Sequence, residues 1–380
     1  MNRYSSIILS VSVCALICLG LVMLFSAQQI PGNDANVSKQ LIWLGVGCVS
    51  CWVLAMVDYR VWTNWGWPCF CVAIFLLGLC FAPGIGVNIN GASRWVTLSS
   101  IGLNLQFQPS EVAKLAGILL MACWYSRYRD QSGTALYGFF LPGCSAMVLV
   151  GLIAIEVDMG SATLLSVAVA IIMLMAGVKF RWLLLGAAGA VGAIVTGVRM
   201  IPERMNRYLA FLDLEKHAQS DGWQQWKALN ALGLGGWDGV GLGKVIGQIR
   251  TLPFLENDFI FPMIGGDLGL QFSLLVVFAY VLIMVAGVTI ALNAPDRFGM
   301  LLGVGIVGLI VFQAIIHIAV TTGSMPNTGL PLPFVSQGGT NLVVCLAGIG
   351  LLLSIHRRAW MEPEYVAPQL RMNLRITPRV

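Results

Sequence analysis

Residues 299–320, GMLLGVGIVGLIVFQAIIHIAV, contain no Asp, Glu, Lys or Arg and are long enough to cross the hydrocarbon core of a bilayer as a helix. Of the 380 residues, 58% are hydrophobic and only 10% are charged, a balance that a polytopic membrane protein needs and a soluble domain does not. Comparable apolar runs begin at Ile7, Gln40, Trp67, Val112, Leu136, Gly160, Trp182, Leu268 and Thr340. The sequence therefore predicts an all-α polytopic membrane protein with about ten transmembrane helices.

A long polar segment, about residues 199–267, separates the seventh and eighth apolar runs. No low-complexity linker and no evident repeat divides the chain, so we expect residues 1–380 to form one domain. A basic tail occupies about residues 357–380. We expect the long segment to be an extracytoplasmic loop, because long loops are translocated largely regardless of their charge.

Basic residues follow one side of the predicted bundle, in the short connections and in the tail. They are Arg3, Arg60, Arg127, Arg129, Lys179, Arg181, Arg297, Arg357, Arg358, Arg371, Arg375 and Arg379. The opposite short connections carry only Lys39 and Arg94. The positive-inside rule then predicts that both termini are cytoplasmic. The net charge of +5 is spread along this membrane edge, where it favours anionic lipid and not nucleic acid as the partner.

All ten cysteines fall within apolar runs that lack neighbouring His or carboxylate ligands. This pattern predicts small packing residues and not disulfides or a zinc site. Polar residues outside the basic edge instead gather in three stretches, all predicted on the outer face.

The first stretch is NINGASRWVTLSSIGLNLQFQPSEVAK, residues 88–114. Pro109 and Ser110 are typical of a helix start, and Glu111 in the first turn suits the helix dipole. Glu111 and Lys114 then share one helix face and are close enough to pair. The pair either neutralises two charges at a helix end or serves a site, and the depth of Lys114 favours the second interpretation.

The second stretch runs from the glycine-rich segment GVGLGKVIGQIR (239–250) to LPFLENDFIFPMIGGDLGL (252–270). Glycine backbone beside Lys244 and Arg250 suits an anion such as phosphate, with a simple turn scaffold as the alternative. A dinucleotide site is disfavoured because no strand precedes the glycines. Asp258 lies where this polar segment meets an apolar helix, and an ionisable group there is a functional-site hypothesis.

The third stretch is TTGSMPNTGLPLPFVSQGGTNL, residues 321–342, which has no charged residue. Its prolines and glycines exclude a regular spanning helix, and irregular backbone at membrane depth is tolerated where it lines a cavity. Ser336, Gln337 and Thr340 are then available to donate or accept hydrogen bonds inside such a cavity.

At these stretches the chain resembles the SEDS family of bacterial membrane proteins, which includes FtsW, RodA and a sporulation relative. The resemblance covers nearly the whole chain and rests on motifs that occur in the family's order. They are NGASRW (90–95), QPSEVAK (108–114), DMGSA (158–162), GLGGWDGVGLG (233–243), LPFLENDFIF (252–261), GGDLGL (265–270) and NTGLPLPFVSQGG (327–339). Asn90 in the first motif favours the FtsW-like division branch over the elongation branch.

The resemblance implies a peptidoglycan glycosyltransferase of the bacterial cytoplasmic membrane, which polymerises lipid II into glycan strands at the outer face. It carries the family's catalytic aspartate onto Asp258 and its paired Glu and Lys onto Glu111 and Lys114. It also implies a class B penicillin-binding protein, a transpeptidase, as partner, among other divisome or elongasome membrane proteins. The chain departs from the family pattern at Glu256, Asn257, Gly266, Asp267, Lys227, Ala228, His317 and Gln337.

Glycan polymerisation requires a sugar hydroxyl to displace undecaprenyl pyrophosphate, with inversion at the sugar carbon when no enzyme nucleophile intervenes. Asp258 is the expected general base, a role typically contributing roughly 100- to 10,000-fold. Growing charge on the pyrophosphate calls for cations, either side chains or a divalent ion such as Mg or Mn; no organic cofactor is expected. The expected substrate-binding residues are Arg94, Gln108, Ser110, Glu111, Lys114, Lys244, Arg250 and Ser336, with Arg204 and Arg207 as further cations.

Two other classes of function remain open at the level of sequence. A lipid II flippase would place its polar groups near the bilayer midplane on broken helices, whereas here they cluster toward one face. A non-catalytic division scaffold would not need Asp258.

Overall fold

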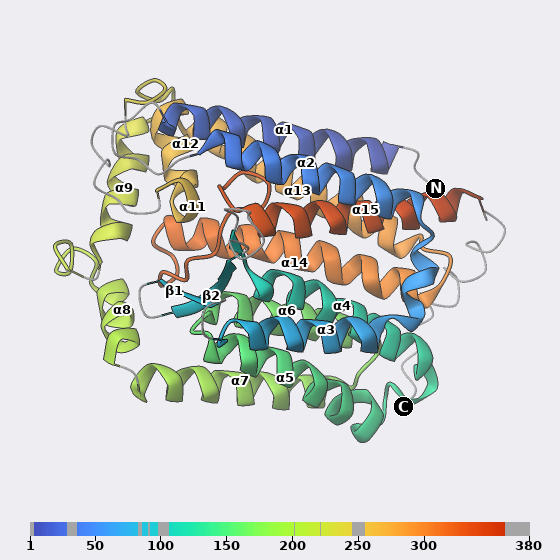
Figure 1. Ribbon diagram of the computed structural model, residues 1–380. Helices are drawn as coiled ribbons and strands as arrows, with labels where there is room; N and C mark the ends of the chain where they lie inside the picture. Colours follow the sequence, from blue (N-terminus) through green and yellow to red (C-terminus); the bar gives the residue numbers. More distant parts are fainter. Residues whose placement is uncertain are drawn as a thin grey trace.

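The computed structural model describes residues 4–28, 36–82, 86–89, 92–97, 106–200, 202–220, 222–244 and 255–361. Its long helices lie side by side in one bundle (Figure 1). They are α1 (Tyr4–Gln28), α2 (Val37–Met56), α3 (Gly66–Leu79), α4 (Pro109–Arg127), α5 (Leu141–Ile155), α6 (Met159–Met175), α7 (Phe180–Met200), α13 (Leu270–Leu292), α14 (Arg297–Thr321) and α15 (Gly339–Met361). Each apolar run of the sequence falls on one of these helices, so the predicted polytopic helical class is confirmed.

The bundle helices differ in how well they match a bilayer. Among the described residues, seven helical segments are long and apolar enough to cross it: α1, α2, residues 136–155, α7, α13, α14 and α15. Two apolar helices, α3 and α6, are shorter. The α4 helix carries Glu111 and Lys114 in its first turns, which explains why a hydropathy criterion does not select it.

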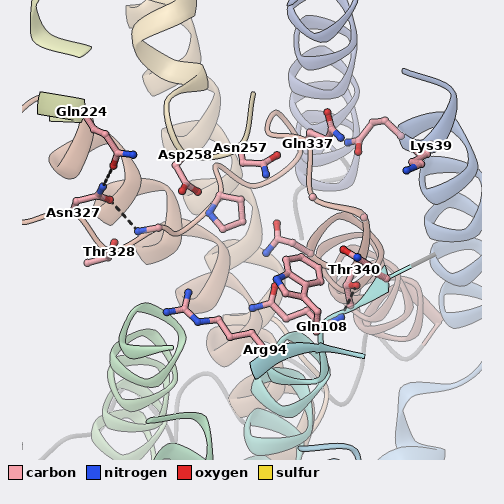
Figure 2. Close-up of a pocket in the computed structure, with 18 of the residues that line it drawn as sticks. Lys39, Arg94, Gln108, Gln224, Asn257, Asp258, Asn327, Thr328, Gln337 and Thr340 are labelled. Carbon is pink, nitrogen blue, oxygen red and sulfur yellow. Dashed lines mark hydrogen bonds between the residues drawn. The ribbon is translucent and has the colours of Figure 1, made fainter. Parts of the chain in front are cut away.

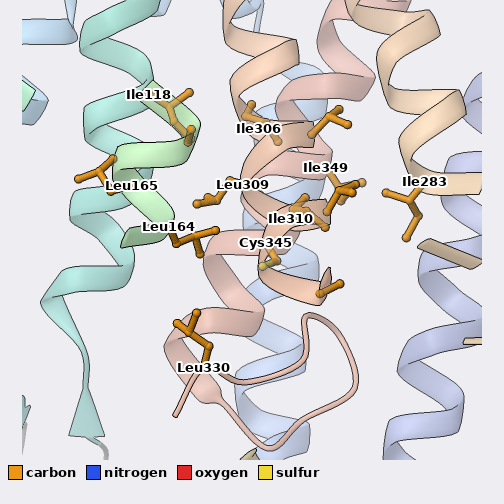
Figure 3. Close-up of a cluster of buried hydrophobic side chains, with 14 of the residues drawn as sticks. Ile118, Leu164, Leu165, Ile283, Ile306, Leu309, Ile310, Leu330, Cys345 and Ile349 are labelled. Atoms are coloured by element: carbon orange, nitrogen blue, oxygen red, sulfur yellow. The ribbon is translucent and has the colours of Figure 1, made fainter. Parts of the chain in front are cut away.

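The core of the bundle is centred on α14, which is largely enclosed by α4, α6, α13 and α15 (Figure 1). Figure 3 shows Ile306, Leu309 and Ile310 of this helix among buried side chains from its neighbours. Close approach is required at Gly305, where a Cβ would lie 2.6 Å from Ile118 Cγ2 and 2.7 Å from Ile172 Cδ1. Small residues permit such packing where hydrophobic burial supplies no net force between helices.

We call one end of the bundle the basic end. It contains residues 57–62, 127–140, 176–182, 294–298 and 354–361. Three short elements connect helices there: η1 (Tyr59–Asn64), η3 (Arg129–Gln131) and the π-helical turn η4 (Leu136–Phe140). Asp296 Oδ2 accepts hydrogen bonds from Tyr59 Oη and from Arg60 Nε, the latter at 3.1 Å. Arg358 Nη2 lies 2.6 Å from Asp58 Oδ2. Short-range ion pairs therefore hold these connections together.

We call the opposite end the polar end. It contains the described parts of the long segment 199–267. They form α8 (Pro202–Leu212), α9 (Trp223–Gly235), α11 (Leu255–Asp258) and α12 (Ile260–Leu268), which cover the ends of the bundle helices (Figure 1). The other contributors to this end are residues 36–43, 86–89, 92–97, 106–114, 156–161 and 322–341.

A small antiparallel sheet at the polar end was not predicted from the sequence. It contains β1 (Gly86–Ile89), β2 (Ala92–Thr97) and β3 (Gln106–Phe107), in the order β1-β2-β3. Val96 pairs with Gly86 on one side and with Phe107 on the other. Because β3 leads into α4, the sheet fixes the position of Gln108 at the helix start.

Candidate substrate cavity at the polar end

A cavity of about 930 Å³ opens among the segments of the polar end. Figure 2 shows side chains from several of these segments around it. Its lining contains Lys39, Gln40, Trp43, Arg94, Trp95, Thr97, Gln106, Gln108, Arg207, Ser220, Trp223, Gln224, Gln225, Asn257, Asp258, Asn327, Thr328, Gly329, Pro331, Gln337, Gly338, Gly339, Thr340 and Asn341. Among the described residues of that lining, Asp258 is the one carboxylate, and the other polar side chains are cations, amides, hydroxyls and tryptophans.

Asp258 ends the short helix α11 and is half-buried on the cavity wall. The next residues, Phe259 to Ile264, are buried in the bundle, so the aspartate sits where polar cavity meets packed core. Gly329 lies beside it, and a Cβ there would be in ordinary contact with Asp258 Oδ2, at 3.6 Å. A side chain at position 329 would be strained because the φ of this residue is +66°.

The segment that carries Asp258 is held by Ser336 of the third polar stretch. Ser336 Oγ donates to the Asn257 carbonyl oxygen (2.6 Å) and accepts from the Leu332 amide (2.8 Å). Ser336 is only 4% exposed and does not line the cavity. The structure therefore places this predicted substrate-binding residue behind the wall, where its hydroxyl ties two backbone segments together.

Glu111 and Lys114 form the predicted pair, with Lys114 Nζ 2.9 Å from Glu111 Oε1. Both are almost fully buried beneath the cavity floor, so neither lines it. Asn341 connects the pair to the cavity, because it lines the cavity and donates from Nδ2 to Glu111 Oε2 (2.9 Å). The geometry gives the pair a supporting position and not direct access to a ligand.

Asp158 organises a second part of the floor from the start of α6. Its Oδ2 accepts from Gln108 Nε2 (3.0 Å) and from Ser110 Oγ (3.2 Å), and its Oδ1 accepts from the Ser161 amide (3.1 Å). Gln108 lines the cavity, whereas Ser110 is fully buried below it. Of these two predicted residues, only Gln108 is placed to touch a ligand.

Arg94 enters the cavity from β2 and donates from Nη2 to the carbonyl oxygen of Val157, a residue with a left-handed φ of +67°. The neighbouring Glu156 is fully buried, and neither of its carboxyl oxygens has a hydrogen-bond partner in the described structure. Burial raises the pKa of Glu156 to about 8, and the nearby charge of Asp158 adds to the rise, while the Cys80 thiol and Arg94 oppose it. The carboxyl is therefore mostly neutral at pH 7.

Several lining residues were missed by sequence reasoning. Lys39 was used only to assign orientation, yet it lines the cavity from the first turn of α2. Asn36 fixes that turn. Its side-chain Oδ1 accepts from the backbone amide of Lys39 (2.9 Å), and its backbone amide donates to Gln337 Oε1 (3.3 Å). Gln40 adds a bond from Nε2 to the Ser336 carbonyl oxygen (3.3 Å). The amide oxygen of Gln337 thus docks the start of α2.

The remaining predicted cations have different outcomes. Arg207 of α8, a less favoured candidate, lines the cavity. Lys244 is exposed and is not among the lining residues. Arg250 lies outside the described residues, as does the side chain of Arg204.

The described residues contain no cluster of three or more His, Cys, Asp or Glu side chains able to hold a metal ion. Asp258 offers one carboxylate, with amide oxygens around it. Mg²⁺ is commonly bound by one or two carboxylates together with substrate phosphates, so this donor set fits the ion only when phosphates supply further ligands.

Comparisons with known proteins agree along the whole chain. Residues 7–360 match the family model of FtsW, RodA and SpoVE, described as cell cycle proteins. The probable peptidoglycan glycosyltransferase FtsW of Trichlorobacter lovleyi is 35% identical over 363 residues, covering 94% of each chain. The stage V sporulation protein E of Bacillus subtilis is 31% identical, covering 90% of this chain and 94% of that protein.

Two solved structures share the fold. One comes from a study of polymerisation and crosslinking by a peptidoglycan synthase complex, with a TM-score of 0.78, 28% identity and coverage of 93% of this chain and 97% of that chain. The other is the rod shape determining protein RodA of Thermus thermophilus, with a TM-score of 0.68, 26% identity and coverage of 93% and 96%. This chain belongs to the FtsW, RodA and SpoVE family of polytopic membrane proteins.

Proposed function

We propose that the protein is a peptidoglycan glycosyltransferase that polymerises lipid II. The observation that carries this proposal is the position of Asp258, the one carboxylate among the described lining residues of a large cavity whose other polar side chains are cations, amides and hydroxyls. Amide side chains form hydrogen bonds with sugar hydroxyls, tryptophan rings pack against sugar rings, and cations pair with pyrophosphate. These are the chemical parts of a lipid-linked disaccharide.

In the reaction, a hydroxyl of the acceptor sugar forms a bond to the anomeric carbon of the donor while the bond from that carbon to undecaprenyl pyrophosphate breaks. Asp258 accepts the hydroxyl proton as general base, and the pyrophosphate leaves with the electron pair. Arg94 and Lys39 line the same cavity and offset its negative charge. Direct displacement inverts the configuration at the anomeric carbon.

A divalent cation, Mg or Mn, fits this scheme as an additional partner of the pyrophosphate. The side-chain oxygen of Asn257 would hold it from the protein side, with the substrate phosphates completing its ligands, while Asp258 serves the acceptor hydroxyl. The ion would supply Lewis-acid stabilisation of the leaving group.

The arrangement favours polymerisation over transport. A flippase requires a binding site near the midplane that opens to each side in turn. Here the cavity belongs to the polar end, and the opposite ends of α2, α14 and α15 are joined by ion pairs and backbone hydrogen bonds. A scaffold, the remaining alternative, has no use for a general base in such a cavity.

We place the polar end at the outer face of the cytoplasmic membrane, with both termini on the cytoplasmic side. The support is the distribution of Lys and Arg, which favours the basic end as the cytoplasmic one. A cysteine replacing Asn257 should then react with an impermeant thiol reagent added from outside, whereas one replacing Arg129 should not. The opposite labelling pattern would overturn this orientation.

A class B penicillin-binding transpeptidase is the proposed partner, and cell division the proposed setting. The support is the similarity to a chain from a peptidoglycan synthase complex, whose study couples polymerisation with crosslinking, and to relatives named FtsW. Addition of the partner is expected to raise polymerisation by the purified protein. Equal turnover with and without it would argue against the coupling.

The decisive experiment is glycan-strand formation from purified lipid II, followed on a gel. Asp258→Asn preserves shape and removes the base, so it should lower the rate by roughly 100- to 10,000-fold. A matched control is Asn327→Asp, which places a carboxylate elsewhere in the lining and should not restore activity to the Asp258→Asn variant. Near-normal product from Asp258→Asn would rule out the general-base role.

A further inference from the structure

Three connections meet at the basic end around the turn between α6 and α7. Arg297, at the start of α14, donates from Nη2 to the Ala176 carbonyl oxygen (2.6 Å). The turn after η3 packs on the same place, because a Cβ on Gly177 would lie 4.0 Å from Ser132 Oγ. Connections far apart in sequence thus converge on the C-terminal end of α6.

Four basic residues lie in these connections, and we refer to Arg129, Lys179, Arg181 and Arg297 as the α6–α7 basic cluster. Lys179 Cε lies 3.8 Å from the position of a Cβ on Gly133, two residues after η3. The charge of Arg129 acts unfavourably on Arg297, and the neighbouring acid Asp130 offsets part of that repulsion. The cluster therefore carries excess positive charge.

The cluster contrasts with the other cations of the same end. Arg60 and Arg358 each form a salt bridge, with Asp296 and Asp58 respectively. Within the described part of the chain, no salt bridge involves a member of the α6–α7 basic cluster, and Arg297 Nε is buried without a hydrogen-bond partner. Among the described residues, one set of cations therefore has carboxylate partners and the other does not.

The flank of the cluster is apolar and aromatic. Large exposed side chains lie beside it in sequence and structure: Leu136, Phe140, Leu174 and Phe180. Trp182 packs against Phe139 and Phe140, with ring centroids 6.0 and 5.6 Å apart, and Arg181 lies 5.2 Å from its ring. The indole Nε1 of Trp182 is also a buried donor without a partner in the described structure.

We infer that the α6–α7 basic cluster binds an anionic phospholipid, with the headgroup phosphate between Lys179, Arg129 and Arg297 and an acyl chain along Leu136, Phe140 and Phe180. A phosphate group supplies acceptors for cations that have no carboxylate partner among the described residues, and the exposed apolar flank suits a chain that is covalently joined to that phosphate. An amphipathic lipid satisfies both parts at once, which neither a free anion nor a neutral lipid does. This inference stands independently of the proposed catalytic activity.

The test uses the full-length chain in nanodiscs of equal phosphatidylglycerol and phosphatidylcholine, with bound lipid counted by native mass spectrometry. The wild type should retain phosphatidylglycerol preferentially. The double variant Arg129→Gln, Lys179→Gln should lower that preference by about 25-fold, because each basic side chain near an anionic headgroup contributes about five-fold. Lys216→Gln makes the same charge change on an exposed turn after α8 and should leave the preference unchanged.

Two further arms keep the inference falsifiable. Arg181→Gln is a milder second variant and should lower the preference by about five-fold. Glycerol phosphate without acyl chains should not stabilise the protein in a thermal scan at concentrations where the lipid does. Equal lipid retention in wild type and double variant, or equal stabilisation by free glycerol phosphate, would overturn a lipid site.

Discussion

At the basic end Arg60 and Arg358 each meet an aspartate within the fold, whereas at the polar end Lys39, Arg94 and Arg207 line an open cavity. The same types of side chain thus act in two ways. At the basic end the partners come from connections distant in sequence, and their ion pairs close that end of the bundle around Asp58 and Asp296. At the polar end the described cations of the cavity wall face an open space instead. The comparison teaches that the placement of aspartates beside the cations decides which end closes and which can hold a substrate.

The largest effect on stability is expected beneath the cavity, at Glu111 and Lys114. Lys114→Met leaves a buried carboxylate with Asn341 as its remaining partner and should destabilise the protein by about 3–5 kcal/mol. The double variant Glu111→Gln, Lys114→Met removes both charges and should lose less. Unfolding in detergent, arranged as a double-mutant cycle, measures the difference. If the losses of stability in the two single variants simply add up in the double variant, the charges of Glu111 and Lys114 are not coupled, and the prediction is wrong.

The next largest effect on stability is expected at Glu156, and its size depends on pH. Because burial raises the pKa of Glu156 to about 8, the folded protein holds a proton that the unfolded chain releases near its ordinary pKa, about 4.5. Stability from this group is therefore present at low pH and falls as pH rises from about 4.5 to 8. Glu156→Gln should match the wild type near pH 5 and gain stability over it, by roughly several kcal/mol at most, toward pH 8. A difference between the two proteins that stays constant with pH would contradict the neutral carboxyl.

Asp296 tests the basic end directly. Asp296→Ala removes the acceptor of Tyr59 Oη and Arg60 Nε and the cap of the Gly299 amide, and should cost roughly 2–3 kcal/mol. Because this site is remote from the cavity, polymerisation per folded molecule should not change. The measurements are thermal unfolding and the lipid II assay. A loss of turnover like that of Asp258→Asn would show that the two ends do not have separate tasks.

The smallest effect is expected at Arg358. The Arg358 and Asp58 side chains are 33% and 21% exposed, so water and salt screen their interaction. Arg358→Gln should cost less than about 1 kcal/mol, and the difference should shrink further at high salt. A loss of several kcal/mol in the same unfolding assay would contradict this prediction, because it would show that the exposed pair stabilises the fold as much as the buried pair of Glu111 and Lys114.

The membrane helices were predictable because apolar length is a local property of the sequence. The pairing of Glu111 with Lys114 was predictable for the same reason, since one helical turn joins them. Asp258 was predicted from its position between a polar segment and an apolar helix, and the resemblance to a family gave it a role. The structure supplies its placement on the cavity wall. The small sheet was missed because β3 has only the two residues Gln106 and Phe107, too few to show an alternating pattern.

The cavity itself could not be predicted, because its lining comes from segments distant in the chain. Lys39 and Asn327 show no pattern in common and meet only after folding. Ser336 was expected to bind substrate because it is polar in an apolar stretch, yet it bonds to backbone groups that no sequence rule identifies. Glu156 was not identified from the sequence, because its unusual burial results from the packing of its neighbours.

The hydrogen bonds of Ser336 also have a consequence for biosynthesis. A ribosome completes Asp258 well before it reaches Ser336, Gly329 and Asn341, the residues that surround the aspartate and its supporting floor. The last helix of the described residues, α15, packs extensively on α2, so a span that is inserted late must find one of the first (Figure 1). Since chains are made from the N-terminus, the site stays unformed until insertion is nearly finished. A nascent chain arrested before α15 would therefore carry its aspartate into the membrane without being able to use it.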